Sequence, residues 1–240
     1  MTFEEIVNHR RSIRVYKDLP IDTEKVKHCV ELDSLSPNSS NMQLWEFYHV
    51  TNPTILKKLS VACLDQSAAT TAQQMLVFVT RRDLFRKRAK KVLELETQNI
   101  LKNSPKERQE KRIKQRQLYY GKLMPFLYGR FLGILGWIRY IFVNIVGIFR
   151  PIFYQVTEND TRVVVHKTCA LAAQTFMLAM AAEGYDTCPM EGFDSRKVKR
   201  LLKLPFGAEI NMVISCGIRD EKGVWGDRMR IPFDEVYKKV

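Results

Sequence analysis

The stretch NHRRSIRVYKDLP, residues 8–20, places three arginines within five positions near the start of the chain. Arg10, Arg11 and Arg14 carry like charges, and cations this close repel one another unless an anion lies between them. Ser12 adds a neutral hydroxyl donor among them. The stretch is therefore either a solvated basic turn or a site that binds phosphate, and the rest of the sequence has to decide between the two.

Helix-like and strand-like segments alternate around this stretch. Apolar spacing and capping residues predict helices at 2–10, 21–35, 52–63, 159–184 and 193–205. Alternating or continuous apolar runs predict strands at 45–51, 74–80 and 210–220. The polar text SPNSSNMQ, residues 36–43, reads as a loop. Few strands among many helices indicate an α+β fold, in which a small mixed or antiparallel sheet is surrounded by helices.

The helix boundaries carry recognisable capping signals. Thr2 and Glu5 have the spacing of a capping box, and Asp22 is a suitable N-cap for the second helix. The long central helix should begin near Asn159 or Asp160 and end at Gly184. This helix is apolar almost all round, so we expect it to be buried.

The basic charge of the chain is concentrated in one segment. The net charge is +13 over 240 residues, yet residues 81–130 hold 16 Lys and Arg against 5 Asp and Glu. The remainder of the chain is close to neutral. A local basic block favours an anionic partner surface, or a well-solvated helix with no partner.

Cysteine and histidine usage points away from disulfide and metal chemistry. The five cysteines are scattered, with no C-x-x-C pair, which is typical of reduced thiols in a cytoplasmic protein. The four histidines are not spaced as metal ligands, so we expect no metal site. The start of the chain, MTFEEIVNHR, lacks the apolar core of a signal peptide.

Four motifs, in order, resemble the FMN-dependent nitroreductase family. RSIR at 11–14 is similar to the phosphate-binding turn of the family, and SPNSSNMQLW at 36–45 to its Ser-Pro loop. CPMEGFD at 188–194 resembles the loop that follows the long central helix in the family, and GDRMR at 226–230 lies where the family often has a pair of basic residues. The resemblance covers roughly residues 1–80 and 157–232. Asn38 stands where a serine is common, and Leu44 replaces the usual proline.

The resemblance implies a homodimer with FMN at the interface, reduced by NADH or NADPH. It implies a nitroaromatic, a quinone or a similar acceptor that then takes the place of the nicotinamide, in a ping-pong mechanism. The flavin carries the chemistry, so no catalytic side chain is expected. The residues assigned by motif are Arg10, Arg11, Ser12 and Arg14 for the phosphate and ribityl end, Ser39, Asn41 and Gln43 from the partner chain, Pro189, Met190, Glu191 and Gly192 along the isoalloxazine with a backbone N–H near N5, and Arg228 and Arg230 closing the phosphate end.

Residues 81–156 form an insertion, first basic and then apolar, within what we expect to be a single domain of residues 1–240. A membrane span is excluded, because one crossing would separate Arg14 from Arg230 and two crossings need more residues than the apolar stretch contains. Two interpretations stay open. The insertion is either a lid and dimer contact over the flavin, or an element of the membrane interface at the inner face of an anionic membrane. No nucleic-acid partner is expected, because the basic helix lacks interleaved aromatic residues.

Three functions fit these observations. The first is an NAD(P)H-dependent FMN oxidoreductase. The second is a specialised flavin enzyme of the same fold, of the reductive dehalogenase or flavin-cleaving type, with the insertion as its substrate lid. The third is a membrane-associated flavin-binding protein with little turnover, which would bind FMN without being reduced by NADH or NADPH.

Overall fold

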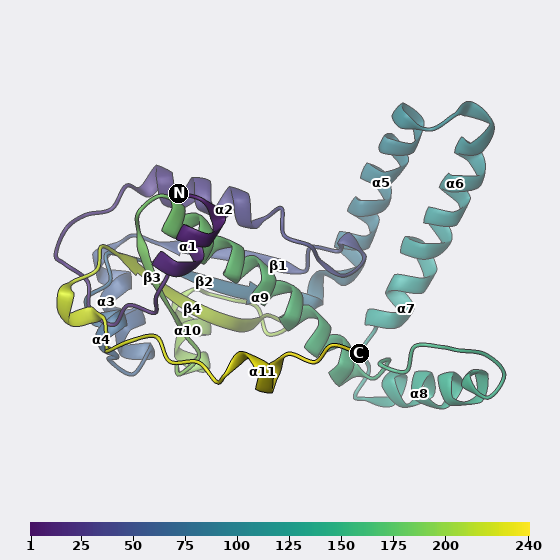
Figure 1. Ribbon diagram of the computed structural model, residues 1–240. Coiled ribbons are helices and arrows are strands. Elements are labelled where there is room, and N and C mark those ends of the chain that lie inside the picture. The colour runs from purple at the N-terminus through teal and green to yellow at the C-terminus, as the bar shows by residue number, and fades with distance from the viewer.

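A four-stranded antiparallel sheet forms the centre of the computed structural model, which describes residues 1–240 (Figure 1). The strands are β1 (Trp45–Val50), β2 (Gln74–Thr80), β3 (Asp186–Met190) and β4 (Glu209–Gly217). Their order across the sheet is β1-β2-β4-β3, and every neighbouring pair is antiparallel. The predicted α+β class is therefore confirmed.

Helices cover both faces of this sheet. The body contains α1 (Phe3–His9), α2 (Thr23–Asp33), α3 (Pro53–Ala62), α4 (Ser67–Thr70), α9 (Glu158–Ala182), α10 (Ser195–Leu201) and α11 (Phe233–Val236). The insertion contains α5 (Phe85–Asn103), α6 (Lys106–Leu118), α7 (Met124–Tyr128) and α8 (Ile134–Gly147). Short 3-10 turns lie at Ser39–Asn41, Arg82–Leu84 and Glu221–Gly223.

Strand β2 divides the core into two halves, because successive side chains on a strand point to opposite faces. Met75, Val77 and Val79 lie in the core half shared with α3 and α10. Leu76 and Phe78 lie in the half shared with α2 and α9. All seven residues of β2 are buried, which explains why its sequence is a continuous apolar run.

The predicted helix starts are confirmed by their capping bonds. Thr2 and Glu5 form the capping box of α1, and the side chain of Asp22 accepts from the first backbone N–H groups of α2. Asn52 caps α3, and Pro53 is its first residue. Capping of this kind stabilises a helix by roughly 1 kcal/mol, because it satisfies backbone donors that have no partner within the helix.

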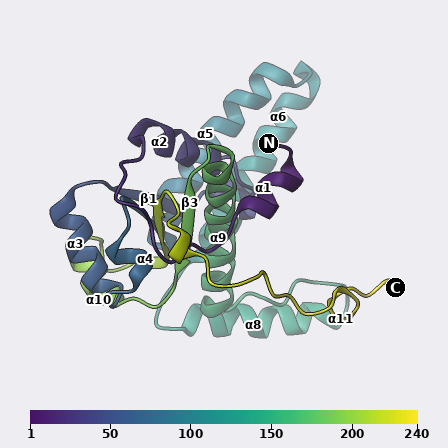
Figure 2. The same cartoon turned by 60° about the vertical axis from the view of Figure 1, so that its left-hand side comes forward.

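Helix α9 is the long central helix that the sequence predicts. It begins at Glu158, one or two residues earlier than expected, because Thr157 forms a capping box with Asp160. It ends before Gly184, which has a φ of +78° and so adopts the left-handed conformation that favours glycine. By length and composition α9 could cross a membrane. Its packing against α2 and the sheet, however, makes it the core helix of the body (Figure 2).

One strand differs from the sequence prediction. Residues 188–190 were expected in a loop, but they belong to β3, which pairs with β4. Pro189 is compatible with this position because β3 is an edge strand, and an edge residue does not need to donate a hydrogen bond on its open side.

The insertion folds as two projecting parts. Helices α5 and α6 form a hairpin that extends away from the body, and α8 lies across the foot of α9 (Figures 1 and 2). Residues Tyr119–Leu123, which follow α6 in the chain, form a π-helical turn. A third hydrophobic cluster joins the insertion to the body through Met42, Leu44 and Val165, so the insertion is anchored on the main fold.

Candidate cofactor site

The first arginine motif is a strand-like segment held against the edge of the sheet. Ile13 is fully buried, and its N–H donates to the carbonyl of Thr187 in β3 at 3.1 Å. The N–H of Arg14 donates to the carbonyl of Gly223 at 2.9 Å. Because neighbouring side chains alternate in an extended segment, burying Ile13 leaves Ser12 and Arg14 on the outer side.

The structure brings together arginines from the two ends of the chain. Burial lowers the pKa of Arg10, and the nearby charges of Arg228, Arg230 and Arg11 lower it further. Burial raises the pKa of the Cys188 thiol, and the charges of Arg14 and Arg10 both oppose this rise. We call Arg10, Arg11, Arg14, Arg228 and Arg230 the arginine cluster.

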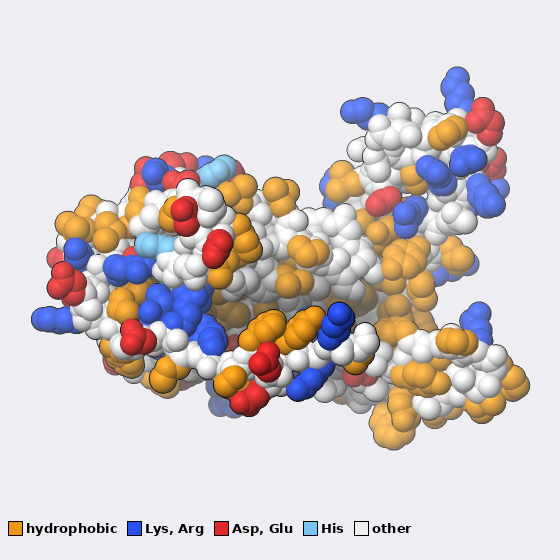
Figure 3. All heavy atoms as spheres, viewed as in Figure 1, with side chains coloured by type: hydrophobic (Ala, Val, Ile, Leu, Met, Phe, Trp, Pro, Cys, Tyr) orange, Lys and Arg blue, Asp and Glu red, His pale blue; other side chains and the backbone are white.

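No carboxylate neutralises the arginine cluster. None of its five members takes part in an ion pair. Figure 3 shows Lys and Arg side chains gathered on the surface beside α1. Guanidinium groups held together without a counter-charge destabilise one another, so the arrangement suits an external anion such as a phosphate.

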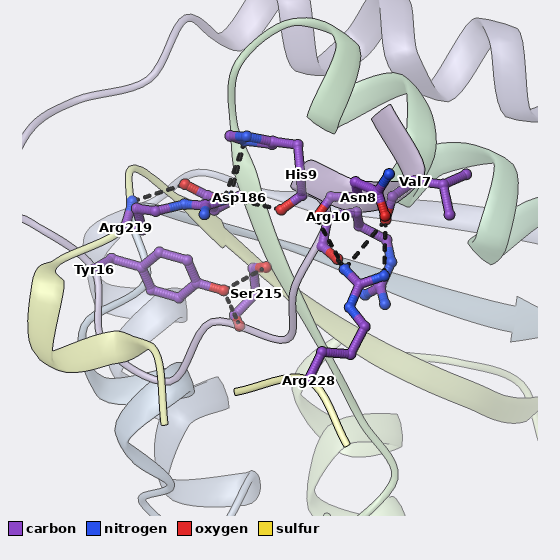
Figure 4. Close-up of polar contacts among 9 residues, drawn as sticks. All are labelled: Val7, Asn8, His9, Arg10, Tyr16, Asp186, Ser215, Arg219 and Arg228. Carbon is purple, nitrogen blue, oxygen red and sulfur yellow. Dashed lines mark hydrogen bonds and ion pairs between the residues drawn. The ribbon is translucent and has the colours of Figure 1, made fainter. Parts of the chain in front are cut away.

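Arg228 is held on the C-terminal end of α1 (Figure 4). Its guanidinium donates to the carbonyls of Val7, Asn8 and Arg10, the last at 2.7 Å. These carbonyls are the acceptors that a helix end leaves without partners, and their partial negative charge attracts a cation. Arg228 therefore ties the C-terminal tail to α1 and has part of its donor capacity already used.

Two further contacts fix the tail beside the arginine motif. The Arg11 guanidinium donates to the carbonyl of Gly226 at 2.9 Å. The Arg14 guanidinium lies 5.6 Å from the ring centroid of Trp225, within cation–π range. The side chain of Arg230 is exposed and donates only to the carbonyl of Met229, so it is free to move toward a ligand.

Arg219 differs from the arginine cluster because it is paired with a carboxylate. Asp186 is buried at the start of β3 and accepts from the Arg219 backbone and guanidinium, each at 2.9 Å (Figure 4). His9 Nε2 lies 3.7 Å from the same carboxylate. Arg219 is thus neutralised within the fold. Sequence reasoning missed this group, because residues 9, 186 and 219 meet only through the folding of the sheet edge.

Tyr16 anchors the end of the arginine motif in the core. Its hydroxyl lies 2.9 Å from the Ser215 hydroxyl and donates to the Ser215 carbonyl at 3.1 Å. Burial raises the pKa of Tyr16 well above its ordinary value, so the phenol stays neutral. The hydrogen bonds of Tyr16 therefore fix the backbone position of the arginines that precede it in the chain.

The turn after β3 offers free backbone donors. Met190 is 2% exposed and its side chain packs in the core, so only its main chain is available to a ligand. Glu191 and Gly192 are exposed, and their N–H groups donate to no protein acceptor. The Gln66 side-chain amide donates to the Gly192 carbonyl at 2.7 Å and holds the turn in place.

The 36–43 loop has an unusual backbone. Ser40, Asn41 and Gln43 have φ values of 55°, 50° and 47°, in the left-handed region that side chains other than glycine rarely adopt. The Asn38 side chain accepts from the Gln43 N–H at 2.9 Å and so stabilises the turn. Strain of this kind is concentrated at functional sites, where surrounding contacts hold it.

Tyrosines from the insertion supply those contacts. The hydroxyls of Tyr119 and Ser40 lie 2.8 Å apart, and Tyr120 donates to the Ser40 carbonyl at 3.0 Å. Tyr128 donates to the Ser39 hydroxyl at 3.4 Å. We call Tyr119, Tyr120 and Tyr128 the tyrosine clamp. Sequence reasoning missed it, and its signal was the text YYGKLMPFLY at 119–128.

The two halves of the predicted site are separate within one chain. Figure 1 shows the 36–43 loop beside the base of α5, well apart from α1 and its arginines. The structure brings Arg10, Ser12 and Arg14 near Arg228 and the β3 edge, but it does not bring them to the 36–43 loop. A site that uses both halves needs a second chain.

Comparison with known proteins identifies the family. The family model described as "Nitroreductase family" matches residues 7–218. MhqN of Bacillus subtilis (strain 168), an NAD(P)H nitroreductase by name, is 24% identical over 216 residues, which cover 90% of this chain and 87% of MhqN. Protein DrgA of Synechocystis sp. is 24% identical over 221 residues, covering 92% of this chain and 85% of DrgA.

Solved structures share the fold. The nitroreductase family protein of Streptococcus pneumoniae TIGR4 has a TM-score of 0.71 at 21% identity and covers 100% of both chains. A nitroreductase by name from Exiguobacterium sibiricum 255-15, in complex with FMN, has a TM-score of 0.70 at 19% identity, over 100% of this chain and 98% of that one. The family match runs through the 81–156 insertion, which the sequence motifs leave uncovered. The chain is an oxidoreductase that belongs to the nitroreductase family.

Proposed function

We propose that the chain is an FMN-dependent oxidoreductase. In this proposal it takes electrons from NADH or NADPH and passes them, by a ping-pong mechanism, to a nitroaromatic, a quinone or a similar small acceptor. The names of the relatives support the nicotinamide donor, and the FMN complex of the Exiguobacterium protein supports the cofactor. The class of electron acceptor is assigned from the family resemblance alone.

The phosphate end of FMN is assigned to the arginine cluster. Arg10 and Arg14 would bind the phosphate through planar, charge-assisted hydrogen bonds, and Ser12 would add a neutral donor. Arg11 and Arg228 already hold the tail and would contribute mainly charge, whereas Arg230 can close over the ligand. The absence of any ion pair in the cluster is the single observation that carries this assignment.

The flavin ring is assigned to the turn after β3. Pro189 would lie along the ring, and the free N–H groups of Glu191 and Gly192 would donate toward N5 of the isoalloxazine. When FMN is bound, the flavin supplies the hydride-transfer chemistry. The protein binds and orients the ring and shields one face from water, and no side chain is assigned as an acid or base.

The remaining contacts come from a second chain. We assign Ser39, Asn41 and Gln43 of a partner subunit to the flavin edge, because their amides and hydroxyls can both donate and accept hydrogen bonds. The separation of the two half-sites within one chain supports a homodimer. We place this dimer in the cytoplasm.

The test is the visible spectrum of the purified protein. The wild type should carry flavin absorbance and bleach when NADH or NADPH is added without oxygen. The double variant Arg10→Ala/Arg14→Ala should lose the flavin and keep its circular dichroism. The matched control Arg196→Ala/Arg200→Ala, which removes two exposed arginines of α10 that form no ion pair, should stay yellow.

Each alternative gives a different result. A folded wild type that takes up no FMN overturns the proposal. A yellow protein that NADH and NADPH do not bleach indicates a flavin-binding protein with little turnover. A protein that bleaches but turns over neither nitrofurazone nor menadione indicates a specialised enzyme of the same fold.

A further inference from the structure

Helix α8 presents an apolar face to the outside of the molecule. Ile134, Trp137, Ile138, Ile141 and Ile145 recur at helical spacing, and each is 50–68% exposed. We call these five residues the α8 face. The lower right of Figure 3 shows hydrophobic side chains covering this projecting part of the molecule. A contiguous apolar surface of this kind marks an interaction site, because water solvates it poorly.

The exposure of the α8 face is built into the packing of the helix. On the opposite side of α8, Arg139 is 1% exposed and donates to the carbonyls of Val156 and Phe126, each at 2.7 Å. The side chain of Glu158 accepts from the backbone N–H groups of Phe131 and Gly133 just before the helix. These hydrogen bonds hold the Arg139 side of α8 against the rest of the protein, so the α8 face on the opposite side is exposed.

The charge around α8 indicates what covers this face. Residues 111–157 contain eight Lys and Arg and no Asp or Glu. Two of them, Arg130 and Arg150, lie just beyond the two ends of α8 and are exposed. An anionic lipid surface brings the opposite charge to these two arginines.

We propose that α8 docks in the interface of an anionic phospholipid bilayer. The helix has 14 residues and is therefore about 21 Å long, shorter than the roughly 30 Å hydrocarbon core, so it lies along the surface. The four isoleucines of the α8 face reach the acyl boundary, and Arg130 and Arg150 contact lipid phosphates. Trp137 and Tyr140, whose rings meet edge to face at 6.1 Å, lie at head-group depth.

This docking does not depend on flavin. One consequence does rest on the proposed function: a protein at the bilayer surface would meet lipophilic quinones dissolved in the membrane. The docking experiment therefore uses binding as its readout, and the flavin content of each sample is measured separately.

Vesicle flotation tests the proposal. At low ionic strength the wild type should float with phosphatidylglycerol/phosphatidylcholine vesicles and float less with phosphatidylcholine alone. Ile141→Ser/Ile145→Ser should reduce the bound fraction about tenfold or more, because each substitution removes apolar area from the interface. Arg130→Gln/Arg150→Gln should weaken binding to the anionic vesicles and leave binding to neutral ones unchanged.

A matched control separates the α8 face from general hydrophobicity. Ile231→Ser/Phe233→Ser removes two tail residues that are 64% and 68% exposed, and it should float like the wild type. The proposal fails if the wild type stays at the bottom of the gradient, or if the α8 variant floats as well as the wild type. It also fails if light scattering shows that Ile141→Ser/Ile145→Ser converts a dimer into monomers while vesicle binding is unchanged. In that case a second copy of the chain, and not lipid, covers the α8 face.

Discussion

Asp33 should make the stability of the fold strongly dependent on pH. The residue is fully buried in the last turn of α2, and neither oxygen of its carboxyl group has a hydrogen-bond partner. Burial raises the pKa of Asp33 from 3.8 to about 8. The carboxyl is therefore protonated in the folded protein at neutral pH, whereas in the unfolded chain it is ionised.

The size of the effect follows from the two pKa values. The folded state holds a proton that the unfolded state releases between about pH 4 and pH 8, so stability falls as the pH rises through this range. Each pH unit contributes about 1.4 kcal/mol, which gives a loss on the order of 4 kcal/mol by about pH 7. Below the unfolded pKa both states are protonated and the loss vanishes.

The substitution Asp33→Asn tests this reasoning, because an amide has the shape of the protonated acid and does not titrate. Urea unfolding at a fixed protein concentration should give similar stabilities for variant and wild type near pH 4. The variant should become the more stable of the two as the pH rises to about 8. Glu31→Gln, an exposed change on the same helix, should leave the wild-type profile unchanged. Parallel profiles for wild type and Asp33→Asn would refute the reasoning.

Three further substitutions have defined outcomes. Tyr120→Phe removes a partly buried hydrogen bond to the 36–43 loop and should lower the unfolding free energy by about 1 kcal/mol, measured by urea denaturation. Arg139→Met leaves three backbone carbonyls without their donor and should cost on the order of 3 kcal/mol, with faster proteolysis of the insertion as the readout. Gly223→Ala places a Cβ 2.3 Å from the Val15 carbonyl oxygen, so it should destabilise by about 1–3 kcal/mol and weaken FMN retention.

Local signals in the sequence were sufficient for most elements of the body. Asp22 and Asn52 mark helix starts because their side chains satisfy donors only two or three residues away. The continuous apolar run of β2 is explained by burial on both faces. Each of these features depends on residues close together in the chain, so pattern and structure agree.

Features that depend on distant residues could not be read in this way. The ion pair of Asp186 with Arg219 joins the start of β3 to the segment that follows β4, and Arg228 reaches α1 from the other end of the chain. The segment of Met190 was expected in a loop because its motif resembles the loop of the family, yet residues 188–190 pair with β4 as an edge strand, which tolerates Pro189. Pattern alone does not reveal which strand lies at an edge.

The tyrosine clamp was missed for a related reason. In a regular helix adjacent residues point about 100° apart, so Tyr119 and Tyr120 would not be expected to serve one loop. The π-helical turn changes the local geometry, and both hydroxyls bond to Ser40. Turns of this kind are rare and often occur at functional sites.

The central claim is that the arginine cluster binds the phosphate of FMN, and comparing FMN with riboflavin tests it most directly. Riboflavin has the same ring and ribityl chain but no phosphate, so the ratio of the two Kd values isolates the phosphate contacts. Charge-assisted hydrogen bonds contribute about 1.5–3 kcal/mol each, so the apoprotein should bind FMN at least ~100-fold more tightly than riboflavin. Arg10→Ala/Arg14→Ala should reduce this ratio to a few-fold. Equal affinities of the wild-type apoprotein for FMN and riboflavin would contradict the account.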